Sequence, residues 1–125
     1  MRDLFATIAP GRRTLITTHD VFRYFAQRYG FEIVGVVVGG GSTHAAPSPQ
    51  ELAALAAAVR RSGMPAIFGE TTLPTRDADT VAREAGTAVK VVVLYTESLG
   101  KSGSETDSYV GMMRVNAERI VEALR

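Results

Sequence analysis

The sequence predicts an α/β fold in three layers, with a four-stranded parallel sheet between two layers of helices. Segments rich in aliphatic and β-branched residues alternate along the chain with segments whose apolar residues recur at helical spacing. The strand-like segments are continuously apolar, as is typical of parallel strands covered on both faces. A length of 125 residues fits one domain with a single core.

The chain is expected to open with a helix, a strand and a second helix. Residues 1–9 read as a short helix, or the end of a longer one, that a Pro-Gly pair stops. The β-branched content of residues 14–18 indicates a strand. Residues 20–29 are predicted to be helical and to end at Gly30. Apolar residues of this second helix share one face: Val21, Phe22, Phe25, Ala26 and Tyr29.

The middle of the chain supplies a second strand and a well-marked helix. Residues 32–38 are predicted to form a buried strand, which a run of three glycines follows. Ser48 is expected to cap the next helix in a capping box with Glu51, and Gly63 is expected to end it. The inward positions of this helix follow i, i+3, i+4, i+7 spacing: Leu52, Leu55, Ala56 and Val59.

The last part of the chain is expected to hold two strands and two helices. Residues 66–68 read as a short strand, residues 75–85 as a helix and residues 88–94 as the most apolar strand. A polar loop over residues 96–106 leads to a final helix, with Asp107 as its predicted cap. The predicted inward face of that helix is Val110, Met113, Ala117, Ile120 and Leu124.

Composition excludes several classes of function. The formal net charge is +1, so no strong field would draw nucleic acid or anionic lipid to the chain. The absence of cysteine excludes disulfides, thiolate metal sites and thiol nucleophiles. No apolar run approaches the roughly 20 residues that span a bilayer, and no apolar segment near Met1 reads as a signal peptide.

Three titratable side chains are expected to meet at one edge of the predicted sheet. His19 follows the first strand, Glu70 the third and Glu97 the fourth. Parallel strands end at the same edge, and ligands of open α/β sheets bind outside that edge. One imidazole and two carboxylates suit zinc, or the harder manganese ion. The sequence therefore predicts a metal site at the carboxyl edge of the sheet.

Each of these residues also has a simpler interpretation when it is taken alone. A histidine after a strand is often a cap or a solvated residue, Glu70 could cap the turn that follows it, and Glu97 could be a solvated loop carboxylate. His44, at the same rim, is interpreted as a free imidazole rather than a ligand because it lies in a glycine-rich segment. The metal interpretation depends on the convergence of the other three.

Sequence motifs of enzymes and of nucleotide sites are incomplete. Residues 100–102, Gly-Lys-Ser, end like a phosphate-binding loop, but Tyr95 stands where that loop needs glycine. No G-x-S-x-G elbow for a hydrolase nucleophile is present, and we expect no enzyme. The glycine-rich residues 39–43 leave one alternative, a flavodoxin-like module that binds a nucleotide or phosphate.

Several motifs, in order from about residue 14 to the C-terminus, resemble the zinc- and manganese-binding lipoproteins and adhesins of ABC transporters. Residues 17–25, TTHDVFRYF, are similar to the family segment t-s-H-d-A-F-x-Y-F. Residues 67–71, IFGET, and 94–100, LYTESLG, resemble its I-F-x-E-s and l-y-x-D-s-l-g segments. The helix start PSPQEL at 47–52 and the segment DSYVGMMRVN at 107–116 match in register as well.

The resemblance implies one lobe of a two-lobed solute-binding protein that holds a metal between its lobes. It implies that residues 1–125 form a single C-terminal metal-binding lobe, without the N-terminal lobe and its two histidines. The position of His19 is the imidazole ligand of that lobe, and Glu97 stands where the family usually has an aspartate ligand. Glu70 matches an acidic residue near the site and is expected to orient His19.

The resemblance also implies a role in uptake. We expect a divalent transition metal as cargo, zinc ahead of manganese, with an ABC permease and the N-terminal lobe as partners. The parent protein is expected to be periplasmic, or extracellular and membrane-anchored, and the missing signal peptide suggests an excised domain. Because the lobe carries half of the ligands, we expect weak metal binding, or a homodimer in which His19 and Glu97 of each copy complete the site. An adhesin or interaction module with a vestigial metal site remains an alternative.

Overall fold

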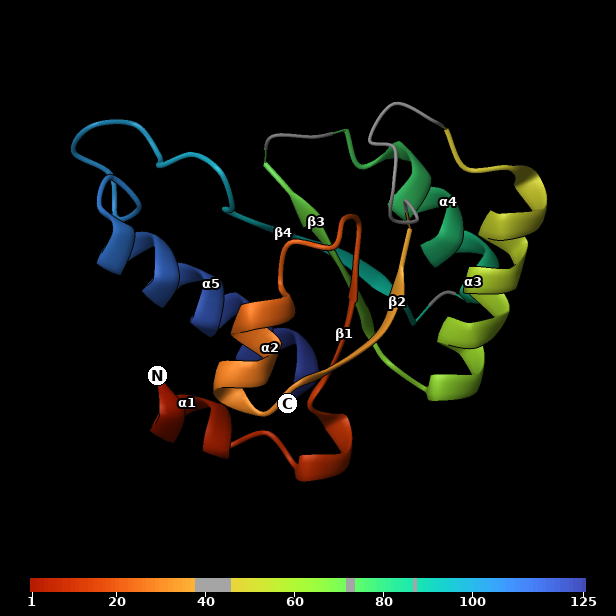
Figure 1. Cartoon of the computed structure of the whole chain (residues 1–125), viewed down its shortest axis with the longest axis horizontal. Coiled ribbons are helices and arrows are strands. Elements are labelled where there is room, and N and C mark those ends of the chain that lie inside the picture. Colours follow the sequence, from red (N-terminus) through yellow and green to blue (C-terminus); the bar gives the residue numbers. More distant parts are fainter. Residues whose placement is uncertain (38–45, 72–73, 87) are drawn as a thin grey trace.

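The sheet is parallel throughout, as the sequence predicts. A computed structural model describes residues 1–37, 46–71, 74–86 and 88–125 of the chain (Figure 1). Every pair of neighbouring strands runs parallel, and the order across the sheet is β2-β1-β3-β4. The strands are β1 (Thr14–Thr17), β2 (Glu32–Val36), β3 (Ala66–Glu70) and β4 (Lys90–Leu94). β1 and β3 are therefore central, and β2 and β4 form the two edges.

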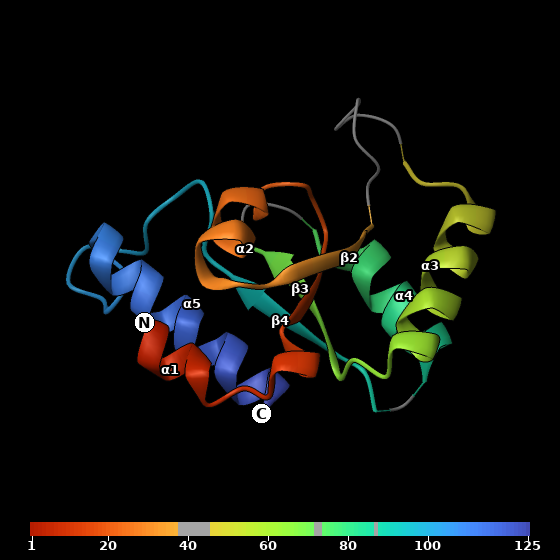
Figure 2. The same ribbon diagram turned by 60° about the horizontal axis from the view of Figure 1, so that its bottom comes forward.

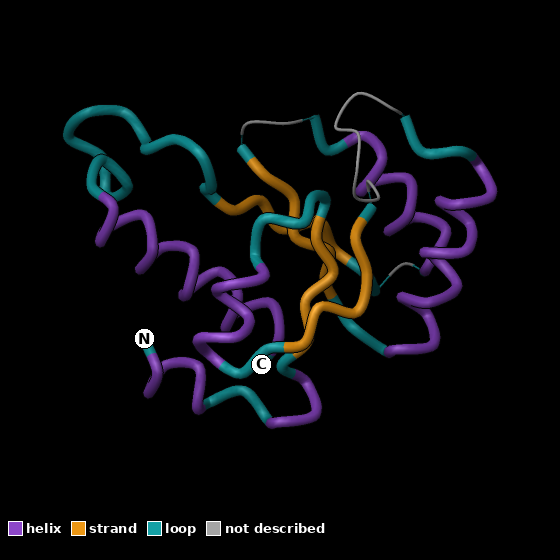
Figure 3. Tube along the Cα trace, in the orientation of Figure 1, coloured by secondary structure: helices purple, strands orange, loops and turns teal. Residues whose placement is uncertain are grey.

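Helices cover both faces of the sheet and complete the predicted three layers. Figures 2 and 3 show helices on either side of the strands. One layer consists of α3 (Pro49–Ser62) and α4 (Arg76–Ala85). The other consists of α1 (Arg2–Ala6), α2 (Arg23–Tyr29) and α5 (Tyr109–Leu124), with a 3-10 turn at Pro10–Arg12 after α1. Within the described ranges, no helix has the length and apolar character needed to cross a membrane.

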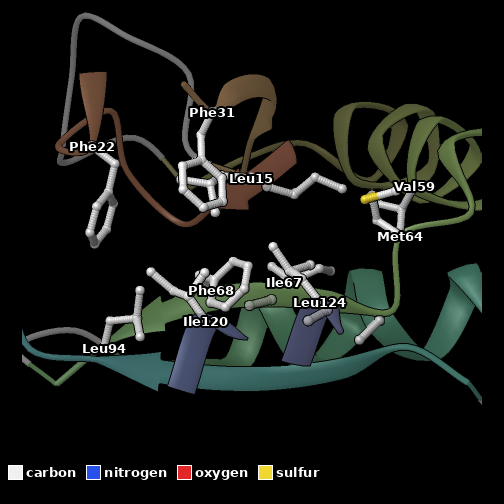
Figure 4. Packing of buried hydrophobic residues seen from close by; sticks show 14 of the residues in the cluster. Leu15, Phe22, Phe31, Val59, Met64, Ile67, Phe68, Leu94, Ile120 and Leu124 are labelled. Carbon is white, nitrogen blue, oxygen red and sulfur yellow. The ribbon is translucent and has the colours of Figure 1, made fainter. Parts of the chain in front are cut away.

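The core lies between the central strands and both helical layers. Ile67 and Phe68 of β3 are fully buried, and Figure 4 shows Phe68 beside Ile120 of α5, across the core from Leu15 and Phe31. An aromatic cluster fixes α1 and α2 to the sheet. Its centre, Phe5, meets three rings edge-on at centroid distances of 5.1 to 5.6 Å: Phe25, Tyr29 and Phe31.

The predicted C-terminal ends of α2 and α3 and the predicted capping box of α3 are confirmed. Ser48 Oγ accepts the Glu51 N–H at 3.2 Å, and the Glu51 carboxylate accepts the Ser48 N–H at 2.7 Å, so the capping box is complete. Gly30 and Gly63 end α2 and α3 in the left-handed conformation, with φ of 72° and 66°.

The start of α2 differs from the prediction. The helix begins at Arg23, and Val21, predicted to face inward, is 43% exposed. Residues 18–22 instead form the connection after β1, where the Thr17 hydroxyl donates to the His19 carbonyl at 2.8 Å. The apolar residues therefore follow helical spacing from Val21, but the helix itself begins only at Arg23.

The start of α5 is also one residue later than predicted. Ser108, and not Asp107, caps the helix, because its Oγ accepts the Gly111 N–H at 3.2 Å. Asp107 instead accepts the Gly103 N–H at 2.9 Å within the preceding loop. Val110, predicted to face inward, is 67% exposed. The buried residues of α5 are Met112, Asn116, Ala117, Ile120, Val121 and Leu124.

Other elements also differ from the prediction in length or burial, and β4, predicted from residue 88, begins at Lys90. The strand predicted over 32–38 ends at Val36 and is partly exposed, because β2 is an edge strand. The predicted helix over 1–9 ends at Ala6. β3 continues beyond Phe68 to Glu70, all of it buried. This last difference matters for function, because it places Glu70 on the sheet itself rather than in a turn.

Candidate metal centre

Glu70 joins the carboxyl ends of three strands. The side chain is buried, with 2% of the residue exposed, at the last position of β3. The Thr18 hydroxyl, directly after β1, donates to Glu70 Oε1 at 3.0 Å. The Thr96 hydroxyl, just after β4, donates to Oε2 at 3.1 Å. These two hydrogen bonds compensate part of the cost of burying the carboxylate.

His19 lies against this carboxylate. Thr18 pairs with β3 through its N–H, which donates to the Phe68 carbonyl at 3.0 Å, and so fixes the backbone just before His19. The imidazole is 15% exposed, and its Nδ1 lies 3.4 Å from Glu70 Oε1. Within the part of the chain that the structure describes, this buried Nδ1 has no hydrogen-bond partner, because the pair is not aligned for one.

The pair has the chemistry of a metal ligand with its orienting carboxylate. A small rotation of the ring would let Nδ1–H donate to Glu70, which leaves the lone pair on Nε2. Neutral imidazole presented in this way is a common zinc ligand in proteins. The orphaned nitrogen and the buried carboxylate thus fit the metal site that the sequence predicts.

Glu97 lies apart from that pair. It is exposed in the loop after β4 and lines a cleft of about 510 Å³ between α2 and α5, together with Tyr24, Tyr95 and Tyr109. Over residues 1–37, 46–71, 74–86 and 88–125, no group of three His, Cys, Asp or Glu side chains is placed to hold a metal ion. The structure therefore brings together two of the three predicted residues. His44 and the glycine-rich residues 39–43 lie outside the described residues.

The residue after His19 is engaged elsewhere. Asp20 forms an exposed ion pair with Arg23 in the first turn of α2, and the hydrogen bond and charge of Asp20 raise the pKa of the Arg23 guanidinium. Ion pairs of this kind contribute little to stability. Because its carboxylate is paired with Arg23, Asp20 is not a candidate ligand.

Sequence reasoning missed three polar residues around the site. Thr18 and Thr96 hold Glu70, and each stands one position before a predicted site residue, which is the signal that could have found them. Asn116 lies on the buried face of α5. Its Oδ1 accepts the Tyr95 N–H at 2.9 Å, and its Nδ2 donates to the Tyr95 carbonyl at 2.6 Å. A polar residue between apolar inward positions was the available signal there.

Sequence comparison identifies the relatives of this chain. The family described as zinc-uptake complex component A, periplasmic (ZnuA), matches residues 1–123. The chain is 37% identical over 118 residues to the zinc-binding protein TroA of Treponema pallidum (strain Nichols), and 30% identical over 124 residues to the manganese-binding lipoprotein MntA of Halalkalibacterium halodurans. These alignments cover 90% and 99% of this chain but 37% and 40% of the relatives. The chain thus spans about two fifths of their length.

Structural comparison agrees with the sequence relationship. The periplasmic zinc-binding protein TroA from Treponema pallidum superposes with a TM-score of 0.86 and 32% identity, over 98% of this chain and 45% of that one. A Mn-bound periplasmic metal-binding protein from Candidatus Liberibacter asiaticus gives a TM-score of 0.82 at 23% identity, over 99% and 45%, which shows the shared fold alone. The predicted resemblance is confirmed by both comparisons. The chain belongs to the ZnuA family of metal-uptake substrate-binding components.

Proposed function

We propose that this chain binds a divalent transition metal for delivery to an ABC permease, as the C-terminal lobe of a two-lobed uptake protein. The observation that carries the proposal is the pair formed by His19 and Glu70 at the carboxyl edge of the sheet. A buried imidazole nitrogen 3.4 Å from a buried carboxylate is an incomplete hydrogen-bonding arrangement. Coordination of a cation at Nε2 gives both groups a function.

We assign a separate role to each of the three predicted residues. His19 is the first ligand, and Glu70 fixes the orientation and tautomer of its ring. Glu97 is the second ligand. It directly follows Thr96, whose hydroxyl bonds Glu70, and its exposed side chain has to move from its described position to reach the metal. Glutamate in place of aspartate adds one methylene of reach.

We place zinc ahead of manganese as the cargo. An imidazole ligand suits zinc, whereas an oxygen-only set would suit manganese better. The names of the relatives include both metals, since TroA is named a zinc-binding and MntA a manganese-binding protein, so the preference for zinc rests on the imidazole. The function is binding and delivery, not catalysis.

The remaining ligands come, in this proposal, from an N-terminal lobe. The chain aligns with about two fifths of its relatives, which leaves room for such a lobe in them. The family is described as periplasmic, and MntA is named a lipoprotein. We propose the same location, periplasmic or extracellular and membrane-anchored, for the parent protein of this lobe.

Thermal unfolding in the presence of metal tests the proposal. A ligand at ten times its Kd stabilises the native state by about 1.4 kcal/mol, so zinc is expected to raise the Tm of the unaltered chain by a few degrees. His19→Ala is expected to abolish this rise. His44→Ala is the matched control, since His44 is the other histidine of the sequence. Equal zinc stabilisation of the unaltered chain and of His19→Ala would refute the proposed site.

A further inference from the structure

Side chains of α5 bond backbone groups at the carboxyl end of the outer edge of β4. Leu94 directs its carbonyl toward β3, where it accepts the Thr71 N–H at 3.0 Å. Successive residues of a strand face opposite neighbours, so Val93 and Tyr95 direct their backbone groups away from β3. An edge of this kind leaves donors and acceptors without strand partners.

Two residues of α5, one helical turn apart, bind these outward groups. Asn116 accepts the Tyr95 N–H at 2.9 Å and donates to the Tyr95 carbonyl at 2.6 Å. Arg119 donates to the Val93 carbonyl at 2.6 Å and stacks over the Tyr95 ring, with its guanidinium carbon 5.2 Å from the centroid. Asn116 is only 3% exposed, so little water reaches its two bonds.

The two hydrogen bonds from Asn116 form a clamp on Tyr95, and the chain leads directly from Tyr95 to the candidate metal site. Tyr95 is followed by Thr96, which donates to Glu70, and then by Glu97. We infer that Asn116 is a positioning residue for metal binding: by holding both backbone groups of Tyr95, it sets where Glu97, two residues further along the chain, stands relative to Glu70 and His19. This inference rests on the proposed function of those residues.

The chemistry of the clamp requires an amide of this length. One oxygen must accept and one nitrogen must donate, at neighbouring backbone groups, and asparagine supplies both from a short, buried stem. Leucine has a similar size and supplies neither, so Asn116→Leu removes both bonds without a large change in volume.

Amide hydrogen exchange tests the clamp itself, without any metal. In the unaltered chain the Tyr95 amide is expected to be protected, and in Asn116→Leu it is expected to exchange at least about tenfold faster. Val59→Ala, at a fully buried position of α3 in the opposite helical layer, is the control for general destabilisation. A Tyr95 amide that exchanges as fast as an unstructured peptide in the unaltered chain would overturn the inference without recourse to any variant.

Metal titration tests the positioning role. Loss of a residue that orients a ligand weakens metal binding by about 10- to 100-fold, so Asn116→Leu is expected to raise the zinc Kd about tenfold while Val59→Ala leaves it unchanged. If Asn116 acts through Glu97 rather than through the Thr96–Glu70 hydrogen bond, Asn116→Leu changes the Kd by less than about twofold in a Glu97→Ala background, and this is the result we expect. The zinc Kd of each variant is measured under conditions in which circular dichroism shows that the variant is folded.

The outcomes separate the inference from the proposed function. An unaltered chain that binds no zinc overturns the proposed function and with it the role of the clamp in binding. An unaltered chain that binds zinc, with Asn116→Leu binding equally well, overturns the inference alone. Fully additive effects of Asn116→Leu and Glu97→Ala also overturn it, since Asn116 would then act by another route.

Discussion

At the scale of single residues, Glu70 and His19 differ in how firmly they are held. Both oxygens of Glu70 accept threonine hydroxyls, one from each flanking strand end, so this carboxylate is fixed before any metal arrives. The backbone of His19 is held, because its carbonyl accepts the Thr17 hydroxyl. Its ring nitrogen Nδ1, in contrast, has no aligned hydrogen-bond partner among the described residues. The Glu70 carboxylate is thus already in position, and a small rotation of the imidazole ring completes the site.

Replacement of Glu70 by glutamine probes that arrangement. The carboxamide keeps the size of the side chain but removes the charge beside His19, and its nitrogen cannot accept a threonine hydroxyl. We expect Glu70→Gln to raise the zinc Kd about tenfold, within the usual range for a residue that orients a ligand. Calorimetric titration measures it, with Glu118→Gln on the exposed face of α5 as the control. An unchanged Kd in Glu70→Gln would show that Glu70 does not orient the ligand.

At the scale of elements, local sequence determined the start of α3 but not the start of α5. Ser48 and Glu51 bond each other's backbone, so every group that forms the cap lies within four residues and the sequence predicts it. Before α5, Asp107 and Ser108 are adjacent and both can cap. The packing of the preceding loop decides between them, because Asp107 is already bonded to Gly103. A contact between residues of the loop cannot be read from helical spacing.

The capping box of α3 gives the fold a pH-dependent contribution. The Ser48 backbone N–H, and then its side chain, hold the pKa of the Glu51 carboxyl below its usual range. A carboxyl whose folded-state pKa is depressed stabilises the native state above the unfolded pKa, and this contribution is lost as the pH falls through the folded pKa. Glu51→Gln cannot ionise. We expect it to be less stable than the unaltered chain near neutral pH and equally stable well below about pH 4.

Chemical unfolding at several pH values measures this difference. Urea midpoints of the unaltered chain and Glu51→Gln are compared from neutral to acid pH. Glu84→Gln, an exposed residue near the end of α4, controls for the loss of one negative charge. A gap between the unaltered chain and Glu51→Gln that persists unchanged in acid would show that the ionised cap is not its source.

The same division between local and distant contacts applies to the site. Parallel strands end at one edge, so the sequence alone places His19, Glu70 and Glu97 near each other. The separation of Glu97 from the other two depends on the loop after β4 and on α5, which lies more than ten residues further along the chain. The threonines that hold Glu70 belong to two other strand ends, and nothing in the local sequence specifies their hydroxyl directions.

At the scale of the whole molecule, the chain supplies part of a metal site. In this proposal its ligands are His19 and Glu97, with Glu70 behind them, whereas zinc in proteins commonly has three or four protein ligands. The chain also covers less than half of each relative and of each solved structure with which it was compared. We therefore expect metal affinity to depend on a second body, either an N-terminal lobe or a second copy.

Titration calorimetry of the 125-residue chain tests this expectation. Zinc and manganese are each expected to bind weakly to the monomer. A tight isotherm with one metal per monomer would refute the half-site. If the second body is another copy, the stoichiometry is expected to be one metal per two chains, with a metal-dependent increase in mass by analytical ultracentrifugation that His19→Ala removes.

The covering of β4 by α5 has a consequence for biosynthesis. During translation β4 leaves the ribosome before α5, so for a time Val91, Val92 and Val93 belong to a strand whose outer edge nothing protects. An open apolar edge is a template for pairing with other nascent chains. When α5 packs on the sheet, Asn116 and Arg119 occupy the carboxyl end of that edge. We therefore expect nascent chains arrested before α5 to aggregate more readily than chains in which α5 has packed on the sheet.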